Sequence, residues 1–474
     1  MTDPAETNHL PVFNASPWHS DGTPALGIGQ RCWPYAELAG LVAEREQRLR
    51  ELGLGPGQVL ICGVDSGLDL ILNQHALARV GAALLPVPSD SHPERLDALT
   101  RQTGAEWHWV PGANGGLLKA TGRTPSRDPA ATEGLALLIQ TSGSSGAPKV
   151  VMLTQGAVLG SCTLVNSVLA LGPGDEWLCC LPLQHVGGLA ISYRCALAGA
   201  TLRLQSGLGS GFDAAAVSAD LARGRVTHLS LVPPMLARLL DSGIGPPRSL
   251  RVLLLGGQAL NRALARRAID AGWPLYLTYG MSETFSQVAT APYSANGAPT
   301  LVGPPLPGVE LDCTPCGETP AVLRLHGPIL MAGYANPQRR PGDGLRDGWL
   351  TTSDLGCVDQ TGALHLLGRA DEMLVIGGVN VLPTAVEDCI AGAPGVEAVA
   401  VVGVPHPVWG QTLAACYAGG ATPDALEDWC RVNLAGAQRP RIFIRRAELP
   451  LLASGKQDRA AIVHLASAGG QTND

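Results

Sequence analysis

The sequence predicts an α/β fold, in which a large N-terminal domain of layered α/β sheets plus a β region precedes a small, mobile C-terminal α+β domain. Between residues 35 and 283, short apolar runs alternate with segments of helical periodicity. Residues 302–367 change to short alternating strands separated by Gly, Pro and Asp turns, which indicates an antiparallel β region. A polar break at residues 368–372 leads into a compact α+β pattern, so the predicted domains are 1–370 and 371–474.

Each element of the alternating part follows from its apolar pattern, and Ser66 is expected to cap the second helix. The predicted helices are 35–52, 67–80, 92–103, 155–171, 214–223 and 234–241. The predicted strands are 59–64, 82–87, 107–110, 135–139, 150–153, 177–181, 228–232, 251–255 and 275–278. Because strands and helices alternate, we expect a parallel sheet with helices on both faces.

From residue 302 onward, the predicted elements are mostly strands. The predicted strands of the β region include 322–325 and 364–367. The C-terminal part has predicted strands at 373–376, 396–403, 413–419 and 441–444, and predicted helices at 383–391 and 423–434.

Length and composition limit the classes of protein that fit. The chain has 474 residues, 46% hydrophobic and 15% charged, so we expect a globular protein of several structural units. The net charge of −7 and the lack of a Lys/Arg block argue against nucleic acid or an anionic membrane as a partner. Small molecules are the expected partners, and a homo-oligomer is left open.

Three features predict a cytoplasmic protein. Residues 1–13 lack the apolar core of a signal peptide. The apolar stretch 68–87 is interrupted by polar side chains, so it is not a membrane span. The 12 cysteines are scattered singly, which favours a reducing compartment, and the lone pair Cys313 and Cys316 is interpreted as incidental rather than as a metal site.

Residues 137–154 predict a phosphate-binding loop. Two apolar runs flank a loop of hydroxyls and glycines, Thr141-Ser-Gly-Ser-Ser-Gly146, which is followed by Lys149. Glycine lets the backbone approach a polyanion, hydroxyl and N–H groups donate hydrogen bonds, and lysine adds positive charge. The Walker A pattern does not fit, because Pro148 precedes the lysine and Val150 follows it. The alternative is a surface linker, but linkers are seldom held between two buried strands.

Polar residues after other predicted strands are further candidates. His185 follows strand 177–181, where α/β proteins bind ligands, although a lone histidine is more often structural. Tyr279 offers a flat face for a base and Glu283 an oxygen ligand for Mg²⁺; the alternatives are a core tyrosine and a helix N-terminal glutamate. Asp354 is suited to bind a ribose diol or to cap a turn.

Five motifs therefore occur in order along the chain. They are Thr141-Ser-Gly-Ser-Ser-Gly-Ala-Pro-Lys149, Tyr279-Gly-Met-Ser-Glu283, Thr352-Ser-Asp354-Leu-Gly, Gly368-Arg369-Ala-Asp371 and Ser454-Gly-Lys456. This set resembles the core motifs of the adenylate-forming acyl-CoA synthetase superfamily, over about residues 30 to 465. Within it, the segments that begin at Leu181, Ser230, Leu255 and Thr278 are most similar to the o-succinylbenzoate–CoA ligases of menaquinone synthesis.

The resemblance implies a two-step, AMP-forming acid–CoA ligase. A carboxylate, here 2-succinylbenzoate, attacks the α-phosphate of ATP and releases pyrophosphate, and the thiol of coenzyme A then displaces AMP to give 2-succinylbenzoyl-CoA. A lysine and Mg²⁺ would stabilise the charge that builds on the phosphoryl oxygens. By the same resemblance, the N-terminal domain holds ATP and the acyl pocket, and the small domain carries the catalytic lysine and rotates at Asp371 between the steps.

The resemblance also assigns residues. It implies Lys149, His185 and Lys456 as catalytic residues and Glu283 as the Mg²⁺ ligand. The residues that it implies for ATP and coenzyme A are Thr141, Ser142, Gly143, Ser144, Ser145, Gly146, Lys149, Tyr279, Gly280, Ser282, Asp354, Arg369, Gly378 and Lys456.

Some positions depart from the family pattern, and they bear on the substrate. Gln184 replaces the common Phe before His185, next to the acyl pocket. A second carboxylate on the acid calls for a donor-rich pocket, for which Arg194, Ser286 and Gln287 are candidates by their place near the motifs. The alternatives are a ligase for another aryl or medium-chain acid, an adenylation enzyme that loads a carrier protein, and a nucleotide-binding regulatory protein that has lost catalysis.

Overall fold

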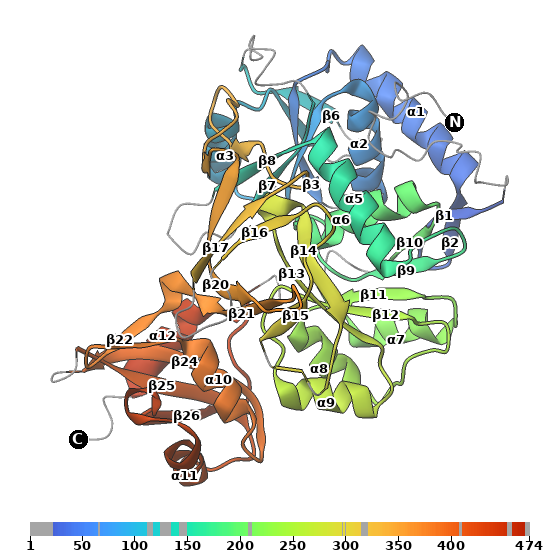
Figure 1. Cartoon of the computed structure of the whole chain (residues 1–474). Helices are drawn as coiled ribbons and strands as arrows, with labels where there is room; N and C mark the ends of the chain where they lie inside the picture. The colour runs from blue at the N-terminus through green and yellow to red at the C-terminus, as the bar shows by residue number, and fades with distance from the viewer. Residues whose placement is uncertain are drawn as a thin grey trace.

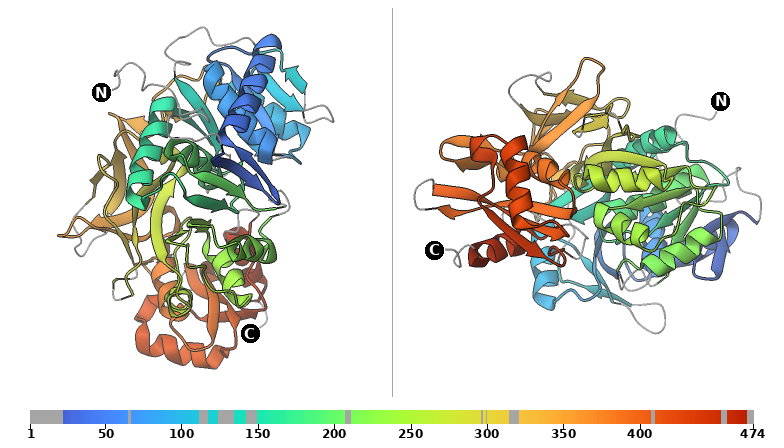
Figure 2. Two further views of the ribbon diagram at one scale, coloured as in Figure 1. Left: turned by 90° about the vertical axis from the view of Figure 1, so that its right-hand side faces the viewer. Right: turned by 90° about the horizontal axis from the view of Figure 1, so that it is seen from below.

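The structure is a computed structural model. It describes residues 22–64, 67–110, 117–123, 134–141, 149–206, 211–295, 297–298, 300–313, 321–406, 410–452 and 457–469. Its larger part contains three sheets, and a smaller part formed by the C-terminal residues packs at one end of it (Figures 1 and 2). This arrangement confirms the predicted fold class.

The first sheet contains the strands on either side of the predicted phosphate loop. Its strand order is β18-β8-β7-β4-β3-β5-β6. The bounds are β3 (Val59–Val64), β4 (Ala83–Pro88), β5 (Trp107–Val110), β6 (Leu117–Ala120), β7 (Leu135–Gln140), β8 (Val150–Thr154) and β18 (Gly333–Tyr334). The central strands β7, β4, β3 and β5 are parallel, whereas β8, β18 and β6 run antiparallel to their neighbours. The sheet is therefore mixed, which corrects the expectation of a parallel sheet.

The second sheet is larger and has the order β14-β13-β12-β11-β9-β10-β1-β2. Its strands are β1 (Pro24–Ile28), β2 (Arg31–Pro34), β9 (Glu176–Cys179), β10 (Thr201–Leu204), β11 (His228–Leu231), β12 (Val252–Leu255), β13 (Leu275–Met281) and β14 (Ser286–Pro292). Only its outermost pairings, β13 with β14 and β1 with β2, are antiparallel. The strand predicted to stop at Thr278 continues to Met281, so the first three residues of the Tyr279 motif lie within β13, and Ser282 and Glu283 follow it in a short 3₁₀ helix.

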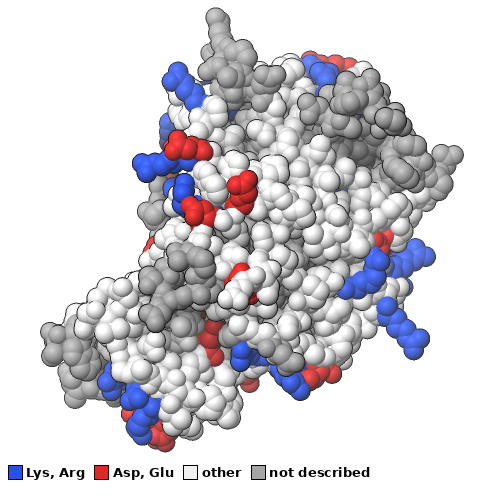
Figure 3. Space-filling model, viewed as in Figure 1, with Lys and Arg blue, Asp and Glu red and all other residues white. Residues whose placement is uncertain are grey.

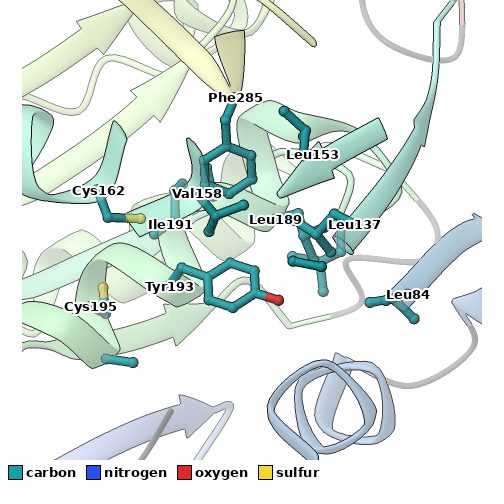
Figure 4. Close-up of a cluster of buried hydrophobic side chains, with 14 of the residues drawn as sticks. Leu84, Leu137, Leu153, Val158, Cys162, Leu189, Ile191, Tyr193, Cys195 and Phe285 are labelled. Carbon is teal, nitrogen blue, oxygen red and sulfur yellow. The ribbon is translucent and has the colours of Figure 1, made fainter. Parts of the chain in front are cut away.

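The helices of the larger part cover these two sheets. They are α1 (Tyr35–Glu51), α2 (Gly67–Val80), α3 (Pro93–Thr103), α5 (Gln155–Leu169), α6 (Val186–Ala198), α7 (Ala214–Ala222), α8 (Pro233–Asp241) and α9 (Arg262–Asp270). The main core joins α5 and α6 to both sheets, as Figure 4 shows for Tyr193, Phe285 and the leucines around them. Every residue of α6 from Gly188 to Ala196 is buried. This helix therefore has no polar face, which explains why periodicity did not predict it.

The third sheet is the antiparallel β region that the sequence predicted. It contains β15 (Leu301–Gly303), β16 (Glu310–Asp312), β17 (Ala321–His326), β19 (Leu345–Arg346), β20 (Trp349–Val358) and β21 (Leu364–Arg369). Its last strand leads through the short 3₁₀ helix η4 (Ala370–Glu372) into the C-terminal part.

The C-terminal part has its own hydrophobic clusters, made only of residues after 373. Its elements are β22 (Leu374–Ile376), β23 (Val379–Val381), α10 (Pro383–Ala391), β24 (Val396–His406), β25 (Gly410–Gly419), α11 (Pro423–Asn433), η5 (Gly436–Gln438), β26 (Ile442–Arg446) and α12 (Arg459–Gly469). It meets the larger part where Thr384 donates to the carbonyl of Leu367 at 2.9 Å and Asn261 donates to that of Glu397 at 3.4 Å. The division at residue 370 stays a prediction.

Two further expectations concern the surface and membranes. Lys and Arg side chains are interspersed with Asp and Glu on the face drawn in Figure 3, and no broad field of one sign occurs there. No helix among the described residues is both long and apolar enough to cross a bilayer. The expected cap Ser66 and the cysteine Cys316 lie outside the described residues.

Candidate functional site

The predicted phosphate loop joins two neighbouring antiparallel strands, β7 and β8. At its neck, the backbone N–H of Thr141 donates to the carbonyl of Lys149 at 2.9 Å, and the Thr141 hydroxyl donates to the same oxygen at 3.3 Å. The strand, loop, strand prediction is therefore correct. The predicted ligands Ser142, Gly143, Ser144, Ser145 and Gly146 lie outside the described residues, so their roles stay predictions.

The side chain of Lys149 contacts Tyr334, a residue that the sequence analysis missed. Its ammonium lies 4.6 Å from the centroid of the Tyr334 ring, and the Tyr334 hydroxyl donates to Glu283 Oε1 at 2.9 Å. Burial, together with the neighbouring Glu283 carboxylate, raises the pKa of Tyr334 above its usual range. The hydroxyl therefore stays protonated and can donate at neutral pH. Residues from two distant motifs thus lie together with Tyr334, which belongs to none of the five motifs. The pairing of β18 with β8, which the sequence analysis did not predict, places the tyrosine there.

Glu283 is held in a rigid turn between β13 and β14. It lies in the short 3₁₀ helix η3 (Ser282–Thr284), and its carbonyl accepts a hydrogen bond from Met331 N–H at 2.8 Å. The next residues, Phe285 and Ser286, have positive φ angles of 46° and 92°. Such a conformation persists in non-glycine residues only when the surroundings enforce it. Here the hydroxyl of Ser161 donates to the Phe285 carbonyl at 3.1 Å.

Glu283 alone would not fill the coordination shell of a magnesium ion, so phosphate oxygens of a nucleotide would have to supply further ligands. The described residues contain no group of three or more His, Cys, Asp or Glu side chains placed to hold a metal. Mg²⁺ in nucleotide enzymes usually takes one or two carboxylates and completes its shell with water and phosphate oxygens. The single partly buried carboxylate of Glu283, beside the cation of Lys149, is consistent with that kind of site.

A second cluster joins Tyr279, Asp354 and Arg369. The Tyr279 hydroxyl donates to Asp354 Oδ2 at 2.6 Å, and Arg369 Nη1 donates to Asp354 Oδ1 at 3.2 Å. Asp354 and Arg369 lie opposite each other on β20 and β21, so strand pairing brings the two motifs together. Burial and the Asp354 carboxylate raise the pKa of Tyr279. Tyr279 as a whole is 8% exposed, and its stacking on adenine stays a prediction.

Backbone packing explains why the Tyr279 motif needs its glycine. A Cβ atom at Gly280 would overlap the carbonyl oxygen of Ser286 on the paired strand β14. Any side chain there would push β13 and β14 apart and displace Tyr279 and Glu283 with them. Gly280 therefore acts through close approach of the backbone rather than through a positive φ.

The sequence analysis placed His185 directly after a strand, but β9 ends at Cys179, so His185 lies six residues farther along the chain. It is the N-cap residue of α6 and is partly exposed. Its predicted role at the acyl pocket stays a prediction.

The two C-terminal candidates differ in what the structure describes. Gly378 is exposed in the two-residue turn between β22 and β23, where Gly377 and Gly378 both have positive φ, as a type I′ hairpin turn requires. The flanking Val375 and Val379 are 55% and 52% exposed. Lys456 lies outside the described residues, although the chain on either side pairs through a bridge between Leu451 and Gln457.

The three residues proposed for the acyl pocket lie on α6 and β14. These elements pack together, with the rings of Tyr193 and Phe285 6.0 Å apart. Arg194 is 1% exposed, and its Nε and Nη2 atoms have no hydrogen-bond partner among the residues that the structure describes. Gln287 is fully buried, and its Nε2 likewise has no partner within that part of the chain. Burial lowers the pKa of Arg194 to about 10, so it remains a cation at neutral pH.

Comparison with known proteins decides the family. The model of the AMP-binding enzyme family matches residues 109–335, and that of the AMP-binding enzyme C-terminal domain matches residues 385–456. The 2-succinylbenzoate–CoA ligase of Geobacillus kaustophilus is 31% identical over 94% of this chain and 96% of its own. The chain belongs to the AMP-binding enzyme family.

Other members of the AMP-binding enzyme family are similar to the same extent. The feruloyl-CoA synthase of an Amycolatopsis species is 32% identical over 91% of this chain and 94% of its own. The solved structure of an arginine-to-lysine variant of E. coli MenE with bound OSB-AMS has a TM-score of 0.78 and 27% identity, covering 94% of this chain and 96% of that one. The predicted membership of the adenylate-forming enzymes is thereby confirmed. The role of each residue stays a prediction.

Proposed function

We propose that this AMP-binding enzyme is an ATP-dependent, AMP-forming ligase that converts 2-succinylbenzoate and coenzyme A to 2-succinylbenzoyl-CoA. Relatives with the name 2-succinylbenzoate–CoA ligase, 31% identical over more than nine tenths of the chain, support the reaction class. The observation that supports the substrate most directly is Arg194, a buried cation on α6, the helix that His185 precedes as the N-cap.

In the first step, a carboxylate oxygen of the acid attacks the α-phosphorus of ATP, and pyrophosphate leaves. We assign Thr141 and Lys149 to the outer phosphates, and Asp354 with Arg369 to the ribose. Glu283 would hold the Mg²⁺ that, when bound, neutralises phosphate charge. Lys456 would stabilise the charge that develops between the α-phosphate and the attacking carboxylate.

In the second step, the sulfur of coenzyme A attacks the acyl carbon and AMP leaves. We propose that residues 371–474 form the small domain and that it rotates at Asp371 between the steps. We propose that the hairpin of β22 and β23, which carries Gly378, lines the path of the pantetheine arm after this rotation. The exposure of Val375 and Val379 then supports the present arrangement as the adenylate-forming one, because this hairpin is not covered by the larger part. We further propose a cytoplasmic enzyme with small-molecule partners, since ATP and coenzyme A are available there.

Arg194 favours an acid with two carboxylates. Among the described residues, the guanidinium contacts the Trp177 ring at 5.9 Å, but its Nε and Nη2 have no hydrogen-bond acceptor. Buried donors without acceptors cost stability, and a substrate carboxylate would supply both charge and acceptors. One carboxylate of 2-succinylbenzoate must face the α-phosphate, which leaves the second for the guanidinium. Ferulate, benzoate and octanoate have only one carboxylate, so they would leave Arg194 unpaired.

The test is a pyrophosphate-release assay with 2-succinylbenzoate, ferulate, benzoate and octanoate. We expect the highest kcat/KM with 2-succinylbenzoate. Arg194→Met should raise the KM for that acid by roughly 10- to 100-fold, because a hydrogen-bonded charge pair is worth about 1.5–3 kcal/mol. The same variant should leave the KM for any one-carboxylate acid that reacts within about twofold, which serves as the internal control.

The alternatives predict other results. Turnover of ferulate or octanoate without turnover of 2-succinylbenzoate would exclude the proposed substrate. An acyl-adenylate that forms but resists coenzyme A, as seen by mass spectrometry, would favour an enzyme that loads a carrier protein. Failure to release pyrophosphate with every acid would favour a regulatory nucleotide-binding protein.

A further inference from the structure

The segment around Tyr334 connects the predicted phosphate loop to the predicted metal carboxylate. Met331 N–H donates to the Glu283 carbonyl at 2.8 Å, Ala332 N–H to the Met152 carbonyl at 2.8 Å, and Ala335 N–H to the Val150 carbonyl at 2.7 Å. One short stretch of backbone thus binds both the strand that leaves the loop and the turn that carries the glutamate. The distance between these two groups is set by this stretch.

The side chain of Tyr334 connects the same two groups. Its ring supports the Lys149 ammonium at 4.6 Å, and its hydroxyl donates to the Glu283 carboxylate at 2.9 Å. Tyr334 lies opposite Val151 in the register of β18 and β8, only two positions after the lysine. The cation and the anion therefore contact different parts of one aromatic side chain.

The ring has little freedom to move away. A Cβ atom at Gly344 would come within 2.5 Å of the ring carbons Cδ2 and Cε2, so the glycine backbone lies directly against it. The Tyr334 N–H also donates to the Asp343 carbonyl at 2.8 Å. A fixed ring reduces the entropy that the lysine and the glutamate lose when nucleotide binds.

We propose that Tyr334 is a positioning residue that couples phosphate binding by Lys149 to metal binding by Glu283. This inference rests on the proposed function, because it takes Lys149 as a phosphate contact and Glu283 as the Mg²⁺ ligand. The ring holds the ammonium at the end of the loop by a cation–π contact, and the hydroxyl fixes the orientation of the carboxylate. Tyr334 itself does not touch the reacting atoms.

The two functions of Tyr334 can be separated by mutation. Tyr334→Phe keeps the ring and removes the hydrogen bond to Glu283, whereas Tyr334→Leu removes both. Tyr293→Phe is the matched control, because this half-buried tyrosine packs against another cluster. The probe is a non-hydrolysable ATP analogue, titrated into the full-length protein by calorimetry with EDTA and then over a series of Mg²⁺ concentrations.

We expect Tyr334→Phe to bind the analogue in EDTA as the wild type does, but to need roughly three- to tenfold more Mg²⁺ for half-maximal tightening. Tyr334→Leu should in addition weaken binding in EDTA by about threefold, the value of an exposed cation–π contact. Circular dichroism spectra would establish that each variant is folded.

Three outcomes are decisive. A normal Mg²⁺ response in Tyr334→Phe, or equal EDTA affinity in the Phe and Leu variants, overturns the coupling while leaving the ligase proposal intact. A wild-type protein that binds no analogue under either condition overturns both proposals. The expected split between the Phe and Leu variants, with Tyr293→Phe unchanged, supports the coupling, since a tyrosine with a merely structural role would not separate the two responses.

Discussion

Arg369 and Asp371 form a two-point ion pair, with Nε to Oδ1 at 2.9 Å and Nη2 to Oδ2 at 2.8 Å. The third nitrogen of the same guanidinium donates to Asp354. Arg369 ends the last strand of the larger part, and Asp371 lies in η4, where the chain enters the smaller part. The proposed ribose site and the proposed hinge therefore share one side chain, whose pKa the bonds to Asp371 raise above its usual range.

Asp371→Asn tests whether this pair holds the present domain arrangement. Both partners are more than one third exposed, so the pair is worth no more than about 1 kcal/mol. We expect the variant to change the ratio of the adenylation and thioester-forming rates by up to about fivefold, in favour of the second step. Single-turnover assays of each half-reaction would measure it. A large loss of ATP affinity instead would mean that Asp371 supports the nucleotide site through Arg369.

Lys456→Ala tests the two-step proposal. Because the lysine is assigned only to the charge of the first step, adenylation should fall by about two orders of magnitude or more. Conversion of a preformed acyl-adenylate by coenzyme A should be nearly unchanged. Lys119→Ala, which removes an exposed lysine from β6, is the matched control. An equal loss in both half-reactions would contradict the proposed domain rotation.

The sequence predicted the fold class because most elements have regular apolar patterns. It missed elements with no periodic pattern, and also the short helix α9, although α9 buries Leu264, Ala265 and Ala268 on one face. The helix α6 is buried from Gly188 to Ala196, and the strands β1 and β10 are short segments that pair with each other across 170 or more residues of chain. The mixed character of the first sheet was also missed. Strand direction depends on how β7 and β8 turn back at the phosphate loop, which periodicity does not report.

The site residues likewise divide into those that the sequence could predict and those that only the structure reveals. Residues in contiguous motifs, such as Thr141, Glu283 and Asp354, could be named from the sequence because their types fit phosphate, Mg²⁺ and ribose. Tyr334 could not, since its relevance comes from contacts to Lys149 and Glu283 that lie 185 and 51 positions away in the chain. Arg194 was named only by its closeness to a motif; its burial, with Nε and Nη2 lacking a hydrogen-bond acceptor among the described residues, makes it a strong candidate and is a tertiary property.

A buried ion pair anchors the segment that follows Tyr334. Arg339, 1% exposed, contacts both oxygens of Glu106 at 2.7 and 3.3 Å and donates to the carbonyls of Thr103 and Gly104. Glu106→Gln would leave the cation buried without a countercharge, so we expect a loss of about 3–5 kcal/mol in the free energy of unfolding. Urea denaturation would measure it, with Glu94→Gln on the exposed face of α3 as the control.

The double variant Glu106→Gln with Arg339→Met completes that test. Removing the cation as well removes the uncompensated charge, so stability should recover in part. If the loss of stability in the double variant equals the sum of the losses in the Glu106→Gln and Arg339→Met single variants, the two side chains do not act as a pair.

Asp388 on α10 makes the stability of the protein depend on pH. Burial raises its pKa to about 6, with Glu387 adding to the shift and Arg262 of the larger part opposing it. The carboxyl therefore binds its proton more tightly in the folded chain than in the unfolded one. Below pH 3.8, the ordinary pKa of the group, ionisation of Asp388 does not lower the stability of the protein. The loss of stability grows as the pH rises to about 6 and is complete above that pH.

Asp388→Asn removes this cost, so the variant should be more stable than the wild type at pH 8 and no more stable near pH 4. The expected rise in Tm at pH 8 is roughly 1–3 °C. Scanning calorimetry at several pH values would follow the difference in Tm between the two proteins, with the exposed Asp90→Asn as the control. A difference that grows as the pH falls would have the wrong sign and would show that Arg262, rather than burial, dominates the environment of Asp388.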